Sequence, residues 1–290
     1  MEKRIDSRLV MRWLPLYELC LYSGSCNRAA GSCDFSQATL NRAHRAIVEL
    51  LEEAEDKKLR DLLPTLRLTA QKLRTAEGFC RIEVDPFLPV TTNGGDLRIE
   101  RWLRHKADLS TSLQLLGERI SDVFVGSLYE LELERSRKLL HFQGKPLVAE
   151  ALIRTPLWRV GPKPRGAIGH HREPILTLHQ RLQHPRLISQ LKTLGYRIET
   201  TARERREIDG PEIAEVISHL QLNHQPIPDQ FSLLDTTPID HDVIGIVYSA
   251  SYAEEQPYFK GLMSQLTRQL RQGLQAETEL ANRTVMAKMV

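Results

Sequence analysis

The residues most able to do chemistry lie in one basic segment, from Arg154 to Arg172. The segment contains no Asp or Glu, and its cationic side chains surround an indole ring. The candidate nucleic-acid-binding residues are Arg154, Trp158, Arg159, Lys163, Arg165 and Arg172. Cationic side chains bind phosphate, and an aromatic ring among them can stack on an unpaired base. The segment therefore predicts contact with nucleic acid or another polyanion, although a solvated linker whose Trp packs on the core would have the same composition.

A second group of residues is acidic and surrounds a predicted strand. Asp122 precedes Glu132, and Glu134 follows on the same face of the strand, with Lys138 nearby. Two carboxylates in this arrangement can hold a divalent cation next to a scissile phosphate. A metal-dependent nuclease is therefore an alternative interpretation. Alternating Glu is also typical of a strand with one face in solvent, which requires no metal.

The cysteines do not follow the spacing of a structural metal site. Cys20, Cys26 and Cys33 have a Cys-x5-Cys-x6-Cys spacing, and Cys80 lies far from them. Structural zinc sites use tighter Cys-x2-Cys pairs, so we expect ordinary thiols, with an iron–sulfur cluster as the open alternative. The chain also has no HExxH, Walker, GxSxG or dinucleotide-binding motif. These observations predict a non-enzymatic protein with no catalytic residue, no metal site and no cofactor.

Composition and charge are those of an ordinary globular protein. The chain has 290 residues, of which 41% are hydrophobic and 27% charged, and its formal net charge is +3. These values exclude a disordered or collagen-like chain. No apolar run approaches the roughly 18 residues of a membrane-spanning helix, and the N-terminus has no signal-peptide pattern. We therefore expect a cytoplasmic protein with no membrane partner.

Hydrophobic periodicity predicts helices at both ends of the chain. Apolar residues recur at helical spacing over 40–54, after Ser36 as a candidate N-cap, and again over 59–76. These two segments predict a helical hairpin within an N-terminal region at 1–78. Apolar residues that recur at three and four positions predict a long terminal helix over 257–290.

The middle of the chain, residues 79–256, is predicted to form a mixed α/β core. Alternating or β-branched patterns predict strands over 80–84, 88–92, 128–134, 147–153, 196–200 and 242–252, and helical spacing predicts helices over 97–116, 178–194 and 211–220. Gln143-Gly144-Lys145-Pro146 predicts the turn of a hairpin. The segment 154–174 predicts a basic loop. The expected fold class is α+β, with an N-terminal helical hairpin, a central mainly antiparallel sheet and a long C-terminal helix.

Part of this core carries a pattern found in a known family. The stretch 131–156 combines Glu134-Arg135-Ser136-Arg137 with the Gly-x-Pro turn at 144–146 and a returning strand. This order resembles the chorismate-lyase-like effector domain of some bacterial regulators. Segments at 195–208, 213–220 and 244–252 are similar in order to its second half. The expected winged helix is not recognisable before residue 80, so no ligand-binding residue is carried over.

Taken together, the sequence favours a regulatory protein that binds the phosphate backbone of nucleic acid through the basic segment. The resemblance implies a small-ligand-sensing regulator as the alternative, and the acidic group implies a nuclease. An adaptor that binds a protein partner through the C-terminal helix stays open as well.

Overall fold

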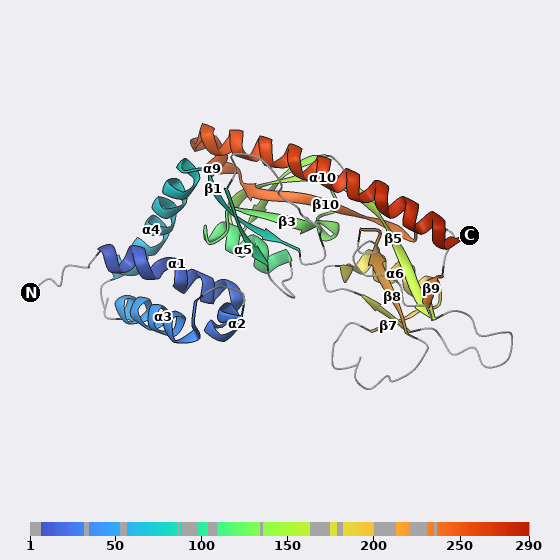
Figure 1. The fold of residues 1–290 in the computed structure, drawn as a ribbon, viewed down its shortest axis with the longest axis horizontal. Helices are drawn as coiled ribbons and strands as arrows, with labels where there is room; N and C mark the ends of the chain where they lie inside the picture. Colours follow the sequence, from blue (N-terminus) through green and yellow to red (C-terminus); the bar gives the residue numbers. More distant parts are fainter. Residues whose placement is uncertain are drawn as a thin grey trace, which may run out of the picture.

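The chain folds into an N-terminal helical unit, a large mixed sheet and a long C-terminal helix (Figure 1). The structure is a computed structural model. It describes residues 7–31, 35–52, 57–85, 88, 98–103, 109–133, 136–162, 175–178, 182–199, 213–220, 231–234 and 237–289. The predicted strand over 88–92 lies outside these residues except for Leu88.

The N-terminal helical unit consists of three helices, and a fourth leads to the sheet. The bounds are α1 (Ser7–Ser23), α2 (Cys26–Ala30), α3 (Gln37–Glu52) and α4 (Lys57–Ala76). Cys20 of α1 and Ala29 of α2 pack against Leu40 and Ala43 of α3. The two predicted helices are therefore present, but α3 packs against α1 and α2, whereas α4 also contacts the sheet and the C-terminal helix.

Ten strands form one sheet within the described part of the chain. They are β1 (Phe79–Val84), β2 (Arg98–Leu103), β3 (Val123–Ser127), β4 (Arg137–Phe142), β5 (Lys145–Pro162), β6 (Ile175–Leu178), β7 (Arg197–Glu199), β8 (Ile213–Ser218), β9 (Phe231–Leu233) and β10 (Asp240–Ser249). The remaining elements are α5 (Leu109–Gly117), the 3-10 turn η1 (Tyr129–Leu131), α6 (Pro185–Thr193), α9 (Ala250–Glu255) and α10 (Pro257–Met289).

The sheet has two halves of the same topology, which we call the first and the second lobe. In the first lobe, β2, β1 and β3 are parallel, and β10 follows antiparallel to β3. In the second lobe, β7, β6 and β8 are parallel, and β5 follows antiparallel to β8. Each lobe is thus completed by an antiparallel strand that connects it to the other lobe.

The connecting strands, β5 and β10, pair with each other from Leu157–Asp240 to Leu147–Ser249. Their register shifts between Ile244 and Gly245. A Cβ atom at Gly245 would lie 2.3 Å from a methyl carbon of Leu128 and 2.6 Å from the carbonyl oxygen of Glu150. Only glycine fits at this bulge, because the chain after β3 crosses directly over it.

Helices cover both faces of the first lobe. Phe259 and Leu266 of α10 pack on the face that includes Val125, whereas Leu113 of α5 packs on the opposite face with Phe124. This division follows from the alternation of side chains along β3. In the second lobe, α6 covers one face with its buried leucines at 187 and 191. In Figure 1, α10 runs along one side of the molecule from the first lobe toward the second.

The prediction of a mixed helix-and-sheet protein with a long C-terminal helix is confirmed. The hairpin turn is confirmed as well, since Gln143 and Gly144 join β4 to β5 with φ values of 49° and 75°. Both residues occupy the left-handed region that a tight hairpin turn requires. The sheet is mixed: five of its nine described strand pairings are antiparallel, and each lobe also contains parallel strands.

Several predicted elements of the core are wrong. The segment predicted as a helix over 97–116 contains β2 and α5, and the helix predicted over 211–220 is β8. Short apolar runs fit both the helical and the strand period. Packing beneath α6 favours the strand conformation of β8. The strand predicted over 128–134 begins with η1 instead, and Glu132 has a positive φ of 44° that turns the chain. The helix predicted over 178–194 starts only at Pro185.

Candidate functional site

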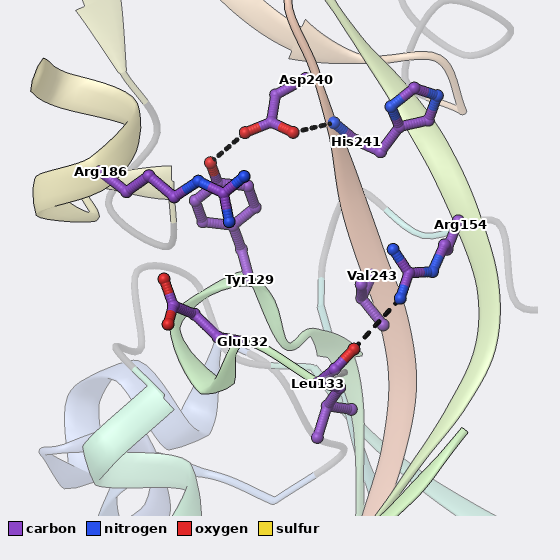
Figure 2. A pocket seen from close by; sticks show the side chains of 8 residues that line it. All are labelled: Tyr129, Glu132, Leu133, Arg154, Arg186, Asp240, His241 and Val243. Atoms are coloured by element: carbon purple, nitrogen blue, oxygen red, sulfur yellow. Dashed lines mark hydrogen bonds between the residues drawn. The ribbon is translucent and has the colours of Figure 1, made fainter. Parts of the chain in front are cut away.

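A polar cavity lies where the two connecting strands pass between the lobes. It has a volume of about 490 Å³. Its lining residues are Tyr129, Glu132, Leu133, Arg154, Arg186, Asp240, His241 and Val243 (Figure 2). We call this cavity the cleft. Small-molecule sites commonly have this size and lie between two lobes of a protein.

Each wall of the cleft comes from a different part of the fold. Tyr129 belongs to η1, which follows β3 at its carboxyl end. Arg186 lies in the first turn of α6, after the carboxyl end of β6. Arg154 and Val243 are paired residues of the connecting strands and form the floor. Both lobes therefore present the carboxyl ends of parallel strands to the cleft, which is where α/β sheets bind ligands.

The cleft holds guanidinium groups that are not neutralised by carboxylates. Arg154 is exposed, and its Nη2 donates a hydrogen bond to the carbonyl oxygen of Leu133 at 3.1 Å. Arg186 is also exposed and forms no ion pair with the residues that the structure describes. Figure 2 shows the two guanidinium groups apart from each other, Arg186 on the side of Tyr129 and Arg154 on the side of Val243. Exposed guanidinium groups facing one space are suited to bind an anion.

A hydrogen bond between Tyr129 and Asp240 spans the cleft wall. The Tyr129 hydroxyl donates to Oδ2 of Asp240 at 2.5 Å, and Oδ1 of the same carboxylate accepts from the backbone N–H of His241 at 2.8 Å. Burial, followed by the hydrogen bond and charge of Asp240, raises the pKa of Tyr129. The Tyr129 ring also meets the ring of His184 in the second lobe, with centroids 5.7 Å apart. Asp240 is therefore engaged, which leaves the two arginines and Glu132 as the charged groups of the cleft with no ion pair to a described residue.

The three predicted nucleic-acid-binding residues that the structure describes, Arg154, Trp158 and Arg159, are not brought together. Arg154 lies in the cleft, whereas Arg159 lies over the ring of Tyr196 at 4.5 Å from its centroid. The segment 154–162 belongs to β5 and is not a loop, because it pairs with β8 and β9. Lys163, Arg165 and Arg172 lie outside the described residues.

Trp158 is buried in the second lobe, with 6% of its surface exposed. Its indole N–H donates to Nδ1 of His219 at 3.0 Å, and the ring packs with Val160 and Ile217. This position corresponds to the alternative interpretation, in which the indole packs on the core. It leaves no open face for stacking on a base.

The acidic residues of the nuclease interpretation lie in separate environments. Asp122 is 1% exposed and accepts hydrogen bonds from the guanidinium of Arg74 at 2.8 and 3.2 Å. Glu132 lines the cleft instead, and Glu134 lies outside the described residues. In the described part of the chain, no group of three or more His, Cys, Asp or Glu side chains could hold a metal ion.

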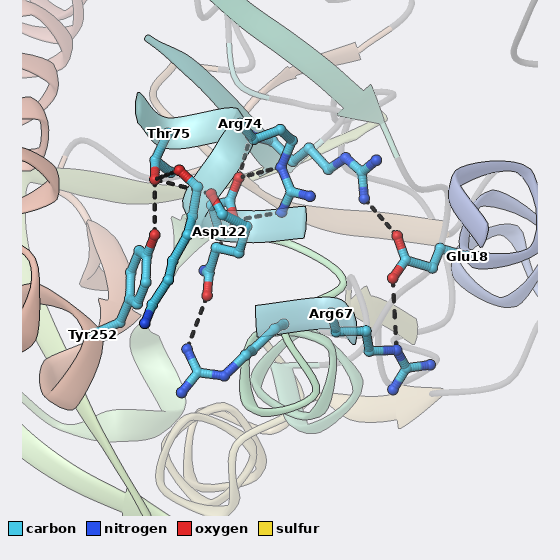
Figure 3. A network of polar contacts seen from close by, with 10 residues as sticks. Glu18, Arg67, Arg74, Thr75, Asp122 and Tyr252 are labelled. Atoms are coloured by element: carbon cyan, nitrogen blue, oxygen red, sulfur yellow. Dashed lines mark hydrogen bonds and ion pairs between the residues drawn. The ribbon is translucent and has the colours of Figure 1, made fainter. Parts of the chain in front are cut away.

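Asp122 belongs to a buried polar network that joins the N-terminal helical unit to the first lobe (Figure 3). Glu18 of α1 pairs with Arg81 of β1 at 2.6 Å and with Arg67 of α4 at 3.6 Å. The Asp122 carboxylate also accepts from the backbone N–H of Arg81 at 2.8 Å. We call these residues, together with Arg74, the buried network. Its charges are paired within the protein, so it holds α1, α4 and β1 together.

The cysteines are thiols in the described part of the chain. Cys20 and Cys80 are buried and Cys26 is half-buried, and none of the three forms a disulfide bond with a described residue, while Cys33 lies outside the described residues. The Cys20 thiol donates to the carbonyl oxygen of Leu40. Burial, followed by the charge of Asp122, raises the pKa of the Cys80 thiol well above its usual range.

Sequence reasoning missed most of the cleft. Tyr129, Arg186 and the neighbouring Asp240 and His241 come from three distant parts of the chain and match no motif. Their position could have indicated the cleft, since each of these residues lies at an end of a strand or at the start of a helix. That signal depends on the correct strand order, which the sequence did not provide.

Comparisons with known proteins were made for the sequence and for the fold. No protein-family model matches the chain, and no curated protein matches its sequence. A hydrogen-peroxide-bound OxyR mutant from Corynebacterium glutamicum is 16% identical, with 97% of each chain covered and a TM-score of 0.48. HypT from Salmonella typhimurium, a LysR-type transcriptional regulator, is 15% identical, with 89% of this chain and 98% of that chain covered and a TM-score of 0.39.

DarR from Vibrio fischeri, in complex with DNA, is 11% identical, with 91% of this chain and 99% of that chain covered and a TM-score of 0.43. Because these TM-scores are below 0.5, the three likenesses carry no argument about this chain. Among the helices that the structure describes, none is both long enough and apolar enough to cross a membrane.

Proposed function

We propose that this chain is a regulator that senses a small acidic molecule in the cleft between its lobes. The observation that supports the proposal is the presence of two exposed guanidinium groups, Arg154 and Arg186, in one cavity of about 490 Å³. A guanidinium group matches the geometry of a carboxylate or a phosphate, and it binds either with paired hydrogen bonds.

The other lining groups indicate what else the ligand carries. Glu132 is exposed in the cleft and forms no ion pair with a described residue. A free carboxylate next to free guanidinium groups favours a ligand that has a hydrogen-bond donor as well as an acidic group. The ring of Tyr129 and the side chains of Leu133 and Val243 supply apolar surface for its carbon skeleton.

The two-lobed topology supports a sensing role for ligand binding. Arg154 belongs to a connecting strand, whereas Arg186 belongs to α6 of the second lobe. An anion held by both residues links the second lobe to the floor of the cleft. Such a ligand binds one arrangement of the lobes more tightly than others and shifts the population toward it.

The test is ligand binding to the full chain with matched variants. A panel of small mono- and dicarboxylic acids, amino acids and phosphate esters is screened by thermal shift, and hits are titrated by calorimetry. We expect Arg154→Gln and Arg186→Gln each to weaken binding of a hit about tenfold or more, because each removes a charged hydrogen bond. Arg268→Gln, an exposed arginine of α10 outside the cleft, is the control. Equal affinity in all three variants would refute the proposal.

A second candidate function, nucleic-acid binding, is favoured by the surface of the N-terminal helical unit. Between residues 24 and 45 the sequence has one acidic residue, Asp34, which lies outside the described residues. The exposed polar residues of α2 and α3 in this stretch are Asn27, Arg28, Gln37, Asn41, Arg42 and Arg45. Two successive helices that expose arginine and amide side chains can contact phosphates and base edges. Contact through Lys163, Arg165 and Arg172 stays a prediction.

The salt dependence of DNA binding distinguishes contact through the N-terminal helical unit from contact through the basic segment. Affinity for a mixed duplex is measured by fluorescence anisotropy at several salt concentrations. If α3 contacts the backbone, the double variant Arg42→Gln, Arg45→Gln lowers the salt slope by about one unit per lost phosphate contact. Arg268→Gln leaves the slope unchanged. A slope that falls only when Lys163 and Arg165 are replaced would place the contact in the basic segment instead.

A further inference from the structure

We propose that the protein has a second binding site, for a small oxyanion of the phosphate type, between α4, the end of α5 and the β4–β5 turn. A cavity of about 270 Å³ lies there, separate from the cleft. Its polar lining residues are Arg67, Glu118, Arg119, Lys145, Ser249 and Ser251. We call this cavity the α4 pocket. The proposal does not depend on ligand binding in the cleft.

The charges around the α4 pocket are predominantly positive. Glu118 is the acidic lining residue, and its carboxylate is already paired with Arg67 at 3.2 Å and accepts from Gln114 at 2.9 Å. Arg119 and Lys145 have no carboxylate partner among the residues that the structure describes. An anion in this cavity therefore meets two cations whose charge is not neutralised.

Arg119 and Lys145 also keep unused donors. Arg119 donates one N–H to Oε1 of Gln71 at 2.8 Å, and its guanidinium lies over the Tyr252 ring at 5.5 Å from the centroid. Lys145 donates to the carbonyl oxygen of Gly117 at 2.6 Å. A guanidinium has five N–H groups and an ammonium has three, so both side chains retain N–H groups for a ligand. The hydroxyls of Ser249 and Ser251, 3.3 Å apart, add further donors.

Arg67 forms the inner wall of the α4 pocket. Its side chain lines the cavity although the residue is only 7% exposed. Its Nε forms no hydrogen bond with a described residue and lies 3.6 Å from Oε1 of Glu18, while its Nη1 pairs with Glu118 at 3.2 Å. Arg67 therefore adds N–H groups to the polar wall of the pocket, but its charge is already paired.

The backbone at Arg119 is the strongest reason to assign a binding role. Arg119 has a φ of 62°, in the left-handed region. It stands directly after α5, where the N–H of Arg119 bonds to the carbonyl of Leu116 at 3.1 Å and the N–H of Ile120 bonds to that of Leu115 at 3.0 Å. Ile120 also packs on Leu115. This is the Schellman arrangement, and its left-handed position strongly favours glycine.

An arginine at this position costs conformational energy that glycine would avoid. The contacts of Arg119 with Gln71 and with the Tyr252 ring offset part of this cost, and an anion bound by its remaining N–H groups would offset more. Because the walls of the pocket come from α4 and from the first lobe, a bound oxyanion would hold α4 against the lobe and raise the unfolding temperature.

The test uses the full chain with inorganic phosphate as the probe and malonate as a carboxylate comparison. Phosphate binding is measured by calorimetry and by the shift in unfolding temperature at constant ionic strength. Arg119→Gly is the decisive variant, because it suits the backbone. We expect it to bind phosphate about tenfold more weakly. Its unfolding temperature without phosphate measures the balance between the relieved backbone strain and the lost contacts with Gln71 and Tyr252.

Lys145→Gln should weaken phosphate binding to a similar extent. Its matched control is Lys138→Gln, since Lys138 is an exposed lysine of the same hairpin that also donates to a backbone carbonyl, that of Leu131. Loss of binding in Lys145→Gln but not in Lys138→Gln or in the cleft variant Arg186→Gln supports the α4 pocket. Stronger binding of malonate than of phosphate, at the same residues, would assign the pocket to a carboxylate instead.

Either of two results would overturn the proposal. One is the absence of phosphate binding to the wild-type chain at millimolar concentration, which would mean that the pocket holds only water. The other is phosphate binding that is lost in Arg186→Gln and retained in Arg119→Gly, which would place the anion in the cleft.

Discussion

In the cleft, Arg154 and Arg186 are exposed and have no carboxylate partner, whereas in the buried network Arg74 and Arg81 are paired with Asp122 and Glu18 at 2.8 and 2.6 Å. The side-chain types are the same in both regions. Their surroundings differ, because the network lies between packed elements and the cleft lies between lobes. A buried charge must be satisfied by the protein, while an exposed one is available to a ligand. The comparison predicts opposite outcomes for matched substitutions in the two regions.

The largest effect is expected for Asp122→Asn in the buried network. The carboxylate accepts from Arg74, from Gln71 at 3.0 Å and from the backbone of Arg81. Its loss leaves the Arg74 guanidinium buried without a counter-charge, which costs about 3–5 kcal/mol in the free energy of unfolding. Urea denaturation measures the change. Glu132→Gln in the cleft is the matched control and should change this free energy by less than about 0.5 kcal/mol. Equal effects would remove the distinction between the two regions.

A smaller and more local effect is expected for Glu18→Gln. Glu18 is 1% exposed and joins α1 to β1 and α4 through Arg81 and Arg67. Weakening these charged hydrogen bonds costs about 2 kcal/mol, so opening of the N-terminal helical unit should become roughly 30-fold more frequent. The rate of hydrogen exchange of amides in α1, α2 and α3 measures how often the unit opens. Glu49→Gln, on the exposed face of α3, should leave exchange unchanged. If Glu18→Gln accelerated hydrogen exchange equally over the whole chain, the effect of the network would not be local to the contact of α1 with β1 and α4.

The hydrogen bond between Tyr129 and Asp240 tests the cleft wall itself. Tyr129→Phe should lower the free energy of unfolding by about 1 kcal/mol at neutral pH. Because the folded pKa of Tyr129 is raised from 10.0, its contribution is complete below pH 10.0 and is lost as the pH rises toward the folded value. The wild-type chain should therefore lose stability more steeply above pH 10.0 than the Phe variant. Denaturation at several alkaline pH values measures the two slopes, and parallel slopes would contradict the assignment.

The smallest effect is expected for the reactivity of a buried thiol compared with that of a partly exposed thiol. Burial raises the pKa of Cys80, which lies in the core of the first lobe, while Cys26 is partly accessible. A small maleimide at neutral pH should modify Cys26 at least tenfold faster than Cys80, because the thiolate is the reactive form. Peptide mapping by mass spectrometry gives the rate at each site. Comparable rates would show that the first lobe opens more readily than its packing indicates.

The accuracy of sequence-based prediction differs among elements for physical reasons. The turn at Gln143-Gly144 and the terminal helix after Pro257 were predicted correctly, because a two-residue turn and a long amphipathic helix are specified by local residues. β8 was predicted as a helix, since six residues with several apolar members fit either period. Trp158 could not be placed, because its exposure depends on the strands and helices that pack around it.

The sequence by itself determined the class of the fold, its long terminal helix and the absence of short catalytic motifs, because these depend on composition and on neighbouring residues. Only the tertiary structure decided which charges are free. Arg154 and Arg186 come from different elements and meet because β5 and β10 pass between two lobes of the same topology. Arg74 and Asp122 meet because α4 packs beside β1. Burial and strand order are properties of the whole chain, and they turn identical side chains into a structural contact in one place and a candidate binding group in another.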